Sequence, residues 1–288
     1  MICKNLESVR RAQLELLNTF IDVCEKNNLR YFVWCGTLLG AVREGGMIPW
    51  DYDVDVCMPI EDYNKLYALN LSGCAFSKPV YLSTFDGCYK FRMNHQLKME
   101  GTTATKVDER LADEQNIFLD IYPMFKMGND KESMDIILRT LKSFCHIRSL
   151  LMINRMGYHG RSTIKTLDGF LLANHNRNKD SNIYVSMHDV VGNCLTEDKI
   201  TEERVNHYSN IVDFDKFLTM DFSGLGRKVR VPENYDEILR NTYGDYMIPV
   251  DESKENRDDI NFLIDGDVDY TVYKSMPEDQ FRSLFTQN

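Results

Sequence analysis

The stretch that decides the fold runs from Trp34 to Met58 and reads WCGTLLGAVREGGMIPWDYDVDVCM. Its last part places Asp51, Asp53 and Asp55 at alternate positions, with aromatic or β-branched residues between them. This alternation is typical of a β-strand, in which every second side chain lies on the same face. We therefore expect the three carboxylates to share one face, where they repel one another unless a cation lies among them. Mg²⁺ or Mn²⁺, hard cations that prefer oxygen ligands, suit such a site.

Two other interpretations of the three aspartates compete with a metal site. The acids are also compatible with the solvated face of an edge strand, where charges discourage aggregation. They match the first, third and fifth positions of a calcium-binding loop, but the sixth position requires glycine and holds Val56, and the twelfth holds Asp62 in place of glutamate. These two positions argue against a calcium-binding loop, whereas the interpretation as a solvated edge strand remains an alternative.

Upstream of the acids, the sequence has the pattern of a phosphate-binding turn. The apolar run from Tyr31 to Cys35 predicts a short buried strand, and Gly36-Thr37 and the helix-like residues 38–42 follow it. Glycine lets the backbone approach a phosphate, and the free N–H groups at a helix N-terminus point toward it. Arg43 closes the short helix and can donate two hydrogen bonds to a phosphate. The short connection to the acidic strand gives the Gly-Thr pair a specificity that it lacks alone.

The segment from Gly36 to Pro59, GTLLGAVREGGMIPWDYDVDVCMP, resembles the signature of the LicD family of phosphotransferases and of the fukutin and fukutin-related proteins. The resemblance implies the nucleotidyltransferase pattern of a Gly-Ser/Thr turn, an Asp-x-Asp strand and a third acid on a neighbouring strand. Many LicD members have aspartate where this chain has Tyr52, so any role of an acid at that position is lost, while Asp53 and Asp55 are unaffected. The implied fold class is α+β, with a nucleotidyltransferase-like mixed β-sheet flanked by helices and a helical middle and C-terminal region.

The third acid is expected at Asp120, within the run IFLDIYP from Ile117 to Pro123. An aspartate in so apolar a strand is costly to bury without a partner, and a metal ion shared with Asp53 and Asp55 would be that partner. The run resembles the third-acid strand of the family, which lies ahead of a proline. The alternative is an acid at a strand end that caps a turn.

Further substrate contacts are predicted less specifically. Lys90 and Arg92 alternate within a run of apolar and aromatic residues, so they share one face of a strand that either binds phosphate or pairs with acids at the surface. Asp51 is a candidate substrate contact beside the metal pair. Tyr243 and Asp245 flank a glycine in a stretch that resembles the C-terminal YGD motif of LicD proteins, where the glycine also suits a helix cap. One sequence does not say whether either residue touches the substrate.

The composition limits the function classes. A net charge of -10 and a pI near 5.2 argue against nucleic-acid binding and against a basic membrane-surface helix. We expect no signal peptide and no transmembrane segment, since no apolar run approaches about 18 residues. This places the chain in the cytoplasm or at the inner face of the membrane. The cysteines form no C-x-x-C pair, so we expect free thiols and no zinc site.

The chain is expected to divide into three regions. Residues 1–126 form the catalytic core and begin with an amphipathic helix over residues 5–27, whose apolar residues recur every three or four positions. Residues 127–215 form a helical region. Residues 216–288 form a C-terminal segment that carries the YGD motif and packs back on the core, and its acidic end carries no prediction of secondary structure.

The resemblance implies a Mg²⁺- or Mn²⁺-dependent reaction. Asp53, Asp55 and Asp120 would be the metal ligands and catalytic acids, and Gly36, Thr37 and Arg43 would hold the phosphates of the donor. The donor would be a CDP-activated alcohol such as CDP-choline. Its phosphocholine or polyol phosphate would pass to a sugar of a surface glycan, such as lipopolysaccharide or another glycolipid, with release of CMP. The alternatives are a nucleotidyltransferase that releases pyrophosphate and a non-catalytic protein that binds nucleotide or glycan.

Overall fold

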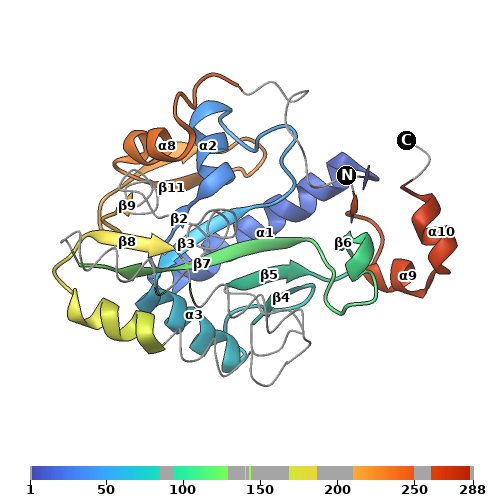
Figure 1. Cartoon of the computed structure of the whole chain (residues 1–288), viewed down its shortest axis with the longest axis horizontal. Coiled ribbons are helices and arrows are strands. Elements are labelled where there is room, and N and C mark those ends of the chain that lie inside the picture. Colours follow the sequence, from blue (N-terminus) through green and yellow to red (C-terminus); the bar gives the residue numbers. More distant parts are fainter. Residues whose placement is uncertain are drawn as a thin grey trace.

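The computed structural model describes residues 2–84, 94–128, 140, 143, 169–186, 210–249 and 261–285. Helices and strands combine within these residues around a mixed β-sheet (Figure 1). The α+β fold class expected from the sequence is therefore confirmed.

The central sheet joins seven strands, and its main path runs β2-β3-β7-β5-β4. In that order the strands span Phe32–Val33, Asp55–Pro59, Phe118–Lys126, His95–Met99 and Val80–Ser83. β3 and β7 are parallel, whereas the other neighbours on this path are antiparallel. β8 (Ile183–Ser186) pairs with the end of β7, and β9 (Asn210–Ile211) pairs with β8. The parallel pair thus brings two segments that are distant in sequence side by side.

The helix α1 (Leu6–Lys26) confirms the amphipathic helix expected over residues 5–27. Asn5 caps its N-terminus, because the side chain accepts a hydrogen bond from the N–H of Ser8 at 3.4 Å. The apolar stripe of α1 faces the core and contacts β5 and β7. Its fully buried members include Leu16, Leu17, Phe20, Ile21 and Cys24. The polar side of the helix stays at the surface, as the periodicity predicts.

Two short helices flank β3 along the chain. α2 (Cys35–Arg43) directly follows β2, and α3 (Ile60–Leu71) begins at the residue after β3. Figure 1 shows β3 and β7 near the middle of the view, with α2 above them and α3 below. The order of strand, helix and strand up to β3 agrees with the prediction for this stretch.

The C-terminal part of the chain packs against the core at two places. The hairpin of β10 (Phe217–Asp221) and β11 (Lys228–Pro232) lies against β2, and α8 (Tyr235–Tyr243) follows it. Near the other end, β12 (Phe262–Asp265) pairs with both β1 (Ile2–Cys3) and β6 (Thr103–Lys106), and a 3-10 turn at Val107–Glu109 follows β6. α9 (Tyr270–Ser275) and α10 (Glu278–Ser283) cover this small sheet with a second apolar cluster. The sequence had predicted no structure there.

The middle region is not purely helical where the structure describes it. Residues 169–177 form a helix, but β8 and β9 follow and extend the central sheet. Most of the helical region expected over residues 127–215 lies outside the described residues, and the three region boundaries stay predictions. Within the described part of the chain, every helix is too short or too polar to cross a bilayer. The cysteines described there are free thiols, as expected.

Candidate active site

Only the last of the three aspartates lies on a strand. β3 begins at Asp55, and Asp51 and Asp53 lie in the irregular segment before it. The expectation of one strand that carries all three acids is therefore wrong. The reason is the shortness of β2: after Val33 the chain turns into α2, and the N–H of Trp34 donates to the carbonyl of Asp55 at 2.9 Å. From that point β2 has no residues left to pair with the acids.

Asp120 lies beside Asp55 in the sheet. The two residues are partners in the parallel pair of β3 and β7, so their side chains project to the same face. They are only 6% and 8% exposed. The N–H of Asp120 also donates to the carbonyl of Val54 at 2.8 Å, which keeps the end of the acidic segment attached to β7. The third acid is thus next to the other acids, as the sequence predicts.

These four aspartates, Asp51, Asp53, Asp55 and Asp120, form what we call the acid cluster. Desolvation raises the pKa of Asp53 well above its ordinary value, and repulsion from Asp55, Asp51 and Asp120 raises it further. Desolvation also raises the pKa of Asp51. Burial and mutual repulsion thus act together in the acid cluster, and a bound cation would relieve both.

Two amide side chains orient Asp120. Nδ2 of Asn94 and Nε2 of Gln96 both donate to Oδ1 of Asp120, at 2.5 and 2.9 Å. Gln96 is the direct partner of Asp120 across β5 and β7, so the sheet register sets this contact. The sequence analysis missed both residues. The alternation of Gln96 and Lys98 with apolar neighbours in β5 was the signal that could have placed Gln96 on the face of the acids.

The Gly-Thr turn packs directly against the acid cluster. Gly36 and Thr37 lie in the first turn of α2, after Cys35 with a left-handed φ of 46°. A Cβ atom on Gly36 would lie 2.6 Å from Oδ2 of Asp51, so only glycine lets this carboxylate approach the helix. Oγ1 of Thr37 accepts the N–H of Asp55 at 2.9 Å and is buried. The turn positions the acids, and its contact with a donor phosphate stays a prediction.

Arg43 lies at the opposite end of α2 from the Gly-Thr turn. Its guanidinium donates to Oε1 of Glu44 at 2.7 Å and to the carbonyl of Tyr246 at 3.1 Å, and its side chain is only 7% exposed. These contacts tie α2 to the segment that follows α8. The structure therefore gives Arg43 a structural role and does not bring it to the first turn of α2.

The YGD residues follow the end of α8. Tyr243 is the last residue of the helix, and Gly244 has a positive φ of 66°, as a cap requires. Tyr243 and Asp245 are exposed, and the carbonyl of Asp245 accepts the N–H of Ile248 at 3.1 Å. The contact of Arg43 with the carbonyl of Tyr246 joins this segment to α2. Its role toward the substrate stays a prediction.

Lys90 and Arg92 lie outside the described residues. The strand that pairs with β7 on this side is β5, and its basic residue on the face of Gln96 is Lys98. Lys98 is buried, and its ammonium group donates to the carbonyl of Glu114. A cation thus lies on the same face of the sheet as Asp120, at a position that the sequence analysis did not single out.

The acid cluster has the chemistry of a divalent metal site but not its finished geometry. Four carboxylates supply only oxygen ligands, which suits Mg²⁺ or Mn²⁺. In the part of the chain that the structure describes, however, no three acidic, histidine or cysteine side chains stand close enough together to hold an ion. The donor types fit, and metal binding stays a proposal.

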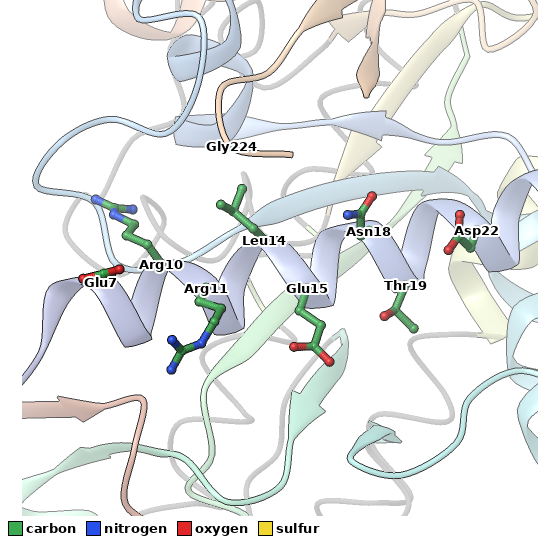
Figure 2. A pocket seen from close by; sticks show the side chains of 9 residues that line it. All are labelled: Glu7, Arg10, Arg11, Leu14, Glu15, Asn18, Thr19, Asp22 and Gly224. Atoms are coloured by element: carbon green, nitrogen blue, oxygen red, sulfur yellow. The ribbon is translucent and has the colours of Figure 1, made fainter. Parts of the chain in front are cut away.

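An open depression of about 640 Å³ lies along α1, and none of the four acids of the cluster lines it (Figure 2). It extends from Glu7 to Asp22 of the helix, and Gly224 is its one lining residue from elsewhere. Because a single helix face lines almost all of it, no groups from different elements converge there as they do around a bound ligand. We therefore place the candidate active site at the acid cluster.

Comparison with known proteins identifies a family for part of the chain. Residues 28–151 match the family LicD/FKTN/FKRP, nucleotidyltransferase domain. The resemblance to the LicD family is confirmed for this segment. The matched residues include the Gly-Thr turn and every member of the acid cluster, whereas α1 lies outside the match.

Curated relatives match over a shorter stretch. The chain is 42% identical over 52 residues to the lipopolysaccharide cholinephosphotransferase LicD of Haemophilus influenzae, which is 18% of this chain and 20% of that protein. It is 46% identical over 52 residues to the ribitol 5-phosphate transferase FKRP of Mus musculus, which is 18% of this chain and 10% of that protein. FKRP of Homo sapiens matches to the same extent. The chain thus covers a fifth or less of the length of these relatives.

Proposed function

We propose that the chain transfers phosphocholine or a polyol phosphate from a CDP-activated alcohol to a sugar hydroxyl of a cell-surface glycan, with Mg²⁺ or Mn²⁺. The observation that carries this proposal is the pairing of Asp55 with Asp120 inside a crowded acid cluster. The LicD and FKRP relatives are a cholinephosphotransferase and a ribitol 5-phosphate transferase, and these activities support the choice of the transferred group. The superfamily assignment rests on the matched domain.

Asp53, Asp55 and Asp120 would hold the metal ion, which supplies charge stabilisation for the phosphate and lowers the pKa of a bound hydroxyl. The sugar oxygen attacks the phosphorus that bears the alcohol, and the bond from that phosphorus to CMP breaks, so CMP leaves with the bonding electrons. Asp120 or Asp55 accepts the proton of the hydroxyl. Asn94 and Gln96 hold Oδ1 of Asp120, which fixes the orientation of its carboxylate.

The donor would bind across the first turn of α2. Gly36 and Thr37 offer backbone N–H groups at the N-terminus of a nine-residue helix, where an anion is stabilised. Asp51, Lys90, Arg92, Tyr243 and Asp245 are the further residues proposed to contact the substrates. Arg43 would contribute by holding α2 in place, because its guanidinium already donates to Glu44 and to the carbonyl of Tyr246.

A panel of CDP-alcohols tests the proposal. The full chain is incubated with CDP-choline, CDP-ribitol or CDP-glycerol, a glycan acceptor and Mg²⁺, and CMP release is measured. We expect turnover with at least one donor, none with excess EDTA, and none in an Asp120→Asn variant. Release of pyrophosphate from CTP would indicate nucleotidyl transfer in its place. Nucleotide binding without turnover, unchanged by Asp120→Asn, would indicate a binding protein and contradict the proposal.

A further inference from the structure

Arg10 of α1 reaches the segment that leads into the acid cluster. Its Nη2 donates to the carbonyls of Ile48 and Pro49, at 2.8 and 2.9 Å. Its Nη1 lies 3.3 Å from Sδ of Met47 and 3.4 Å from Oε1 of Gln13. Figure 2 shows Arg10 directed to one side of α1, while Arg11 points to the other. One guanidinium thus holds three consecutive residues of the segment before Asp51.

The contact continues directly into the backbone of the acid cluster. The carbonyl of Ile48 that accepts Nη2 of Arg10 also accepts the N–H of Asp51, at 3.1 Å. The side chain of Ile48 is buried, so this carbonyl has little freedom to move. Because Asp51 and Asp53 precede β3, no sheet hydrogen bond fixes their own backbone as β3 fixes Asp55. Arg10 supplies from α1 a restraint that the sheet does not give.

The charge of Arg10 also faces the acid cluster. Desolvation lowers the pKa of Arg10, and the nearby charges of Asp51 and Asp53 raise it again. A half-buried guanidinium this close to two acids remains charged and attracts their carboxylates. Both the hydrogen bonds and the charge of Arg10 therefore favour the same placement of the segment that leads into the acid cluster.

We propose that Arg10 is a positioning residue for the metal site: it holds residues 47–53 so that the carboxylate of Asp53 reaches an ion bound by Asp55 and Asp120. This inference rests on the proposed metal-dependent function. It assigns a role to a residue outside the segment that matches the LicD family. A guanidinium suits this place because Nη2 donates to two neighbouring carbonyls while Nη1 contacts Met47 and Gln13, whereas the single nitrogen of an ammonium group can reach only some of these partners.

Mn²⁺ binding to the full-length folded variants tests the role of Arg10. Free Mn²⁺ is measured by electron paramagnetic resonance during titration, below the melting temperature of each protein. We expect Arg10→Met to weaken Mn²⁺ binding about 10-fold, as loss of an outer contact to a metal ligand does. Arg10→Lys, which keeps the charge, should restore binding in part. In the transferase assay kcat should fall in the same order, with little change in the KM of the donor.

Arg11 provides the matched control. It is the next residue of the same helix, but its side chain is 66% exposed and its partner is Asp267, 3.4 Å away. Arg11→Met should therefore bind Mn²⁺ like the wild type. An equal loss in Arg10→Met and Arg11→Met would overturn the inference, as would unchanged Mn²⁺ binding in Arg10→Met, or an effect confined to the KM of the donor. If Arg10→Met does not fold, Arg10→Lys is compared with the wild type in its place. Weaker Mn²⁺ binding by Arg10→Lys then supports the inference, and unchanged binding overturns it.

An Asp55→Asn variant separates this inference from the proposed function. If Asp55→Asn binds Mn²⁺ like the wild type, the metal site itself is wrong. If Asp55→Asn loses Mn²⁺ binding while the folded Arg10 variants keep it, the site stands and only the role of Arg10 fails.

Discussion

The chain contains the pattern D-x-D-x-D twice, and the two copies have opposite environments. The first copy is Asp51, Asp53 and Asp55, which lie among one another and beside Asp120. The second copy is 265–269, with the sequence DGDVD, which joins β12 to α9. Alternating acids therefore do not by themselves identify a metal site.

In the second copy each acid has donors of its own. Asp265 accepts the hydroxyl of Tyr273 at 2.6 Å, and Asp267 accepts Nδ2 of Asn5 at 2.8 Å. Asp269 caps α9, because it accepts the N–H of the residue two positions on, at 3.0 Å. Desolvation alone would raise the pKa of Asp269, but the hydrogen bonds that this acid accepts lower it below the ordinary value. The pKa of Asp53 is instead raised, by desolvation and by repulsion from the neighbouring acids. What distinguishes the copies is the surroundings of their acids: those of the first repel one another in a buried place, whereas each acid of the second accepts hydrogen bonds from nearby donors.

The largest expected difference between the two copies is in activity. Asp55→Asn removes one negative ligand from the acid cluster, so we expect kcat/KM to fall by more than about 100-fold, beyond the usual effect of an outer-shell change. Asp267→Asn alters an exposed acid at the surface, so kcat/KM should stay within about 2-fold of the wild type and stability within about 1 kcal/mol. CMP release under identical conditions measures both. Equal losses in the two variants would contradict the distinction.

Gly36→Ala should lower the activity that depends on the first D-x-D-x-D copy without unfolding the protein. The new Cβ would lie 2.6 Å from Oδ2 of Asp51, and the carboxylate would have to move away. A displacement of this kind costs up to about 100-fold in rate. The free energy of unfolding should change less, because the obstructing atom ends a side chain. Activity and thermal melting are measured on the same preparation.

A double-mutant cycle checks the cause of that loss. If the clash with Asp51 is responsible, Gly36→Ala should cost little in a background that already carries Asp51→Ser. A full loss of activity in that background would mean that Gly36 acts in another way, such as through the donor phosphate.

Gly266→Ala is the corresponding change in the second copy, and it should affect stability. Its Cβ would lie 2.4 Å from the backbone carbon of Ser8 in α1, which cannot move aside without shifting the helix. We expect a loss of about 1–3 kcal/mol in unfolding free energy, measured by urea denaturation. Gly169→Ala is the control, since none of the residues that the structure describes lies within 4 Å of its Cβ position. If both substitutions have the same effect, the close packing of 265–269 on α1 is not important for stability.

The smallest expected effect is a difference of sign in how stability depends on pH. The folded pKa of Asp53 is raised, so between about pH 3.8 and that pKa the folded state binds more protons than the unfolded state, and the contribution of Asp53 to stability is lost as pH rises. The folded pKa of Asp269 is lowered, so its contribution is present above about pH 3.8 and lost as pH falls.

In metal-free protein at pH 7, Asp53→Asn should therefore raise the melting temperature and Asp269→Asn should lower it. A change of about 1 kcal/mol corresponds to roughly 2–4 °C for a chain of this size. Both differences from the wild type should shrink as pH falls toward 3.5. A lower melting temperature for Asp53→Asn at pH 7 would contradict the raised pKa of Asp53.

Much of the core follows from local sequence patterns. The periodicity of α1, the order of α2, β3 and α3, and the apolar strand with Asp120 depend on residues close in the sequence, and all are confirmed. The departure of Asp51 and Asp53 from the strand depends on the length of β2, a different segment. Sequence reasoning cannot see that length, since a two-residue strand has no periodicity of its own.

The missed parts are those that long-range partners decide. The structure of 261–285 depends on pairing of β12 with β1 and β6, which lie far away in the sequence. Arg10 has no local signal at all, because an arginine on a half-exposed helix position is ordinary until the segment 47–49 packs against it. Gln96 had a signal, the alternation in β5, but its meaning depended on the register with Asp120.

The two carboxamides on Asp120 give the acid cluster a fixed reference point. The carboxamides of Asn94 and Gln96 neither gain nor lose protons across the pH range in which a protein stays folded. They can therefore donate the same hydrogen bonds to Oδ1 of Asp120 in mild acid and in mild alkali. One acid of the cluster thus keeps a fixed orientation over a range of pH in which the protonation of its neighbours changes.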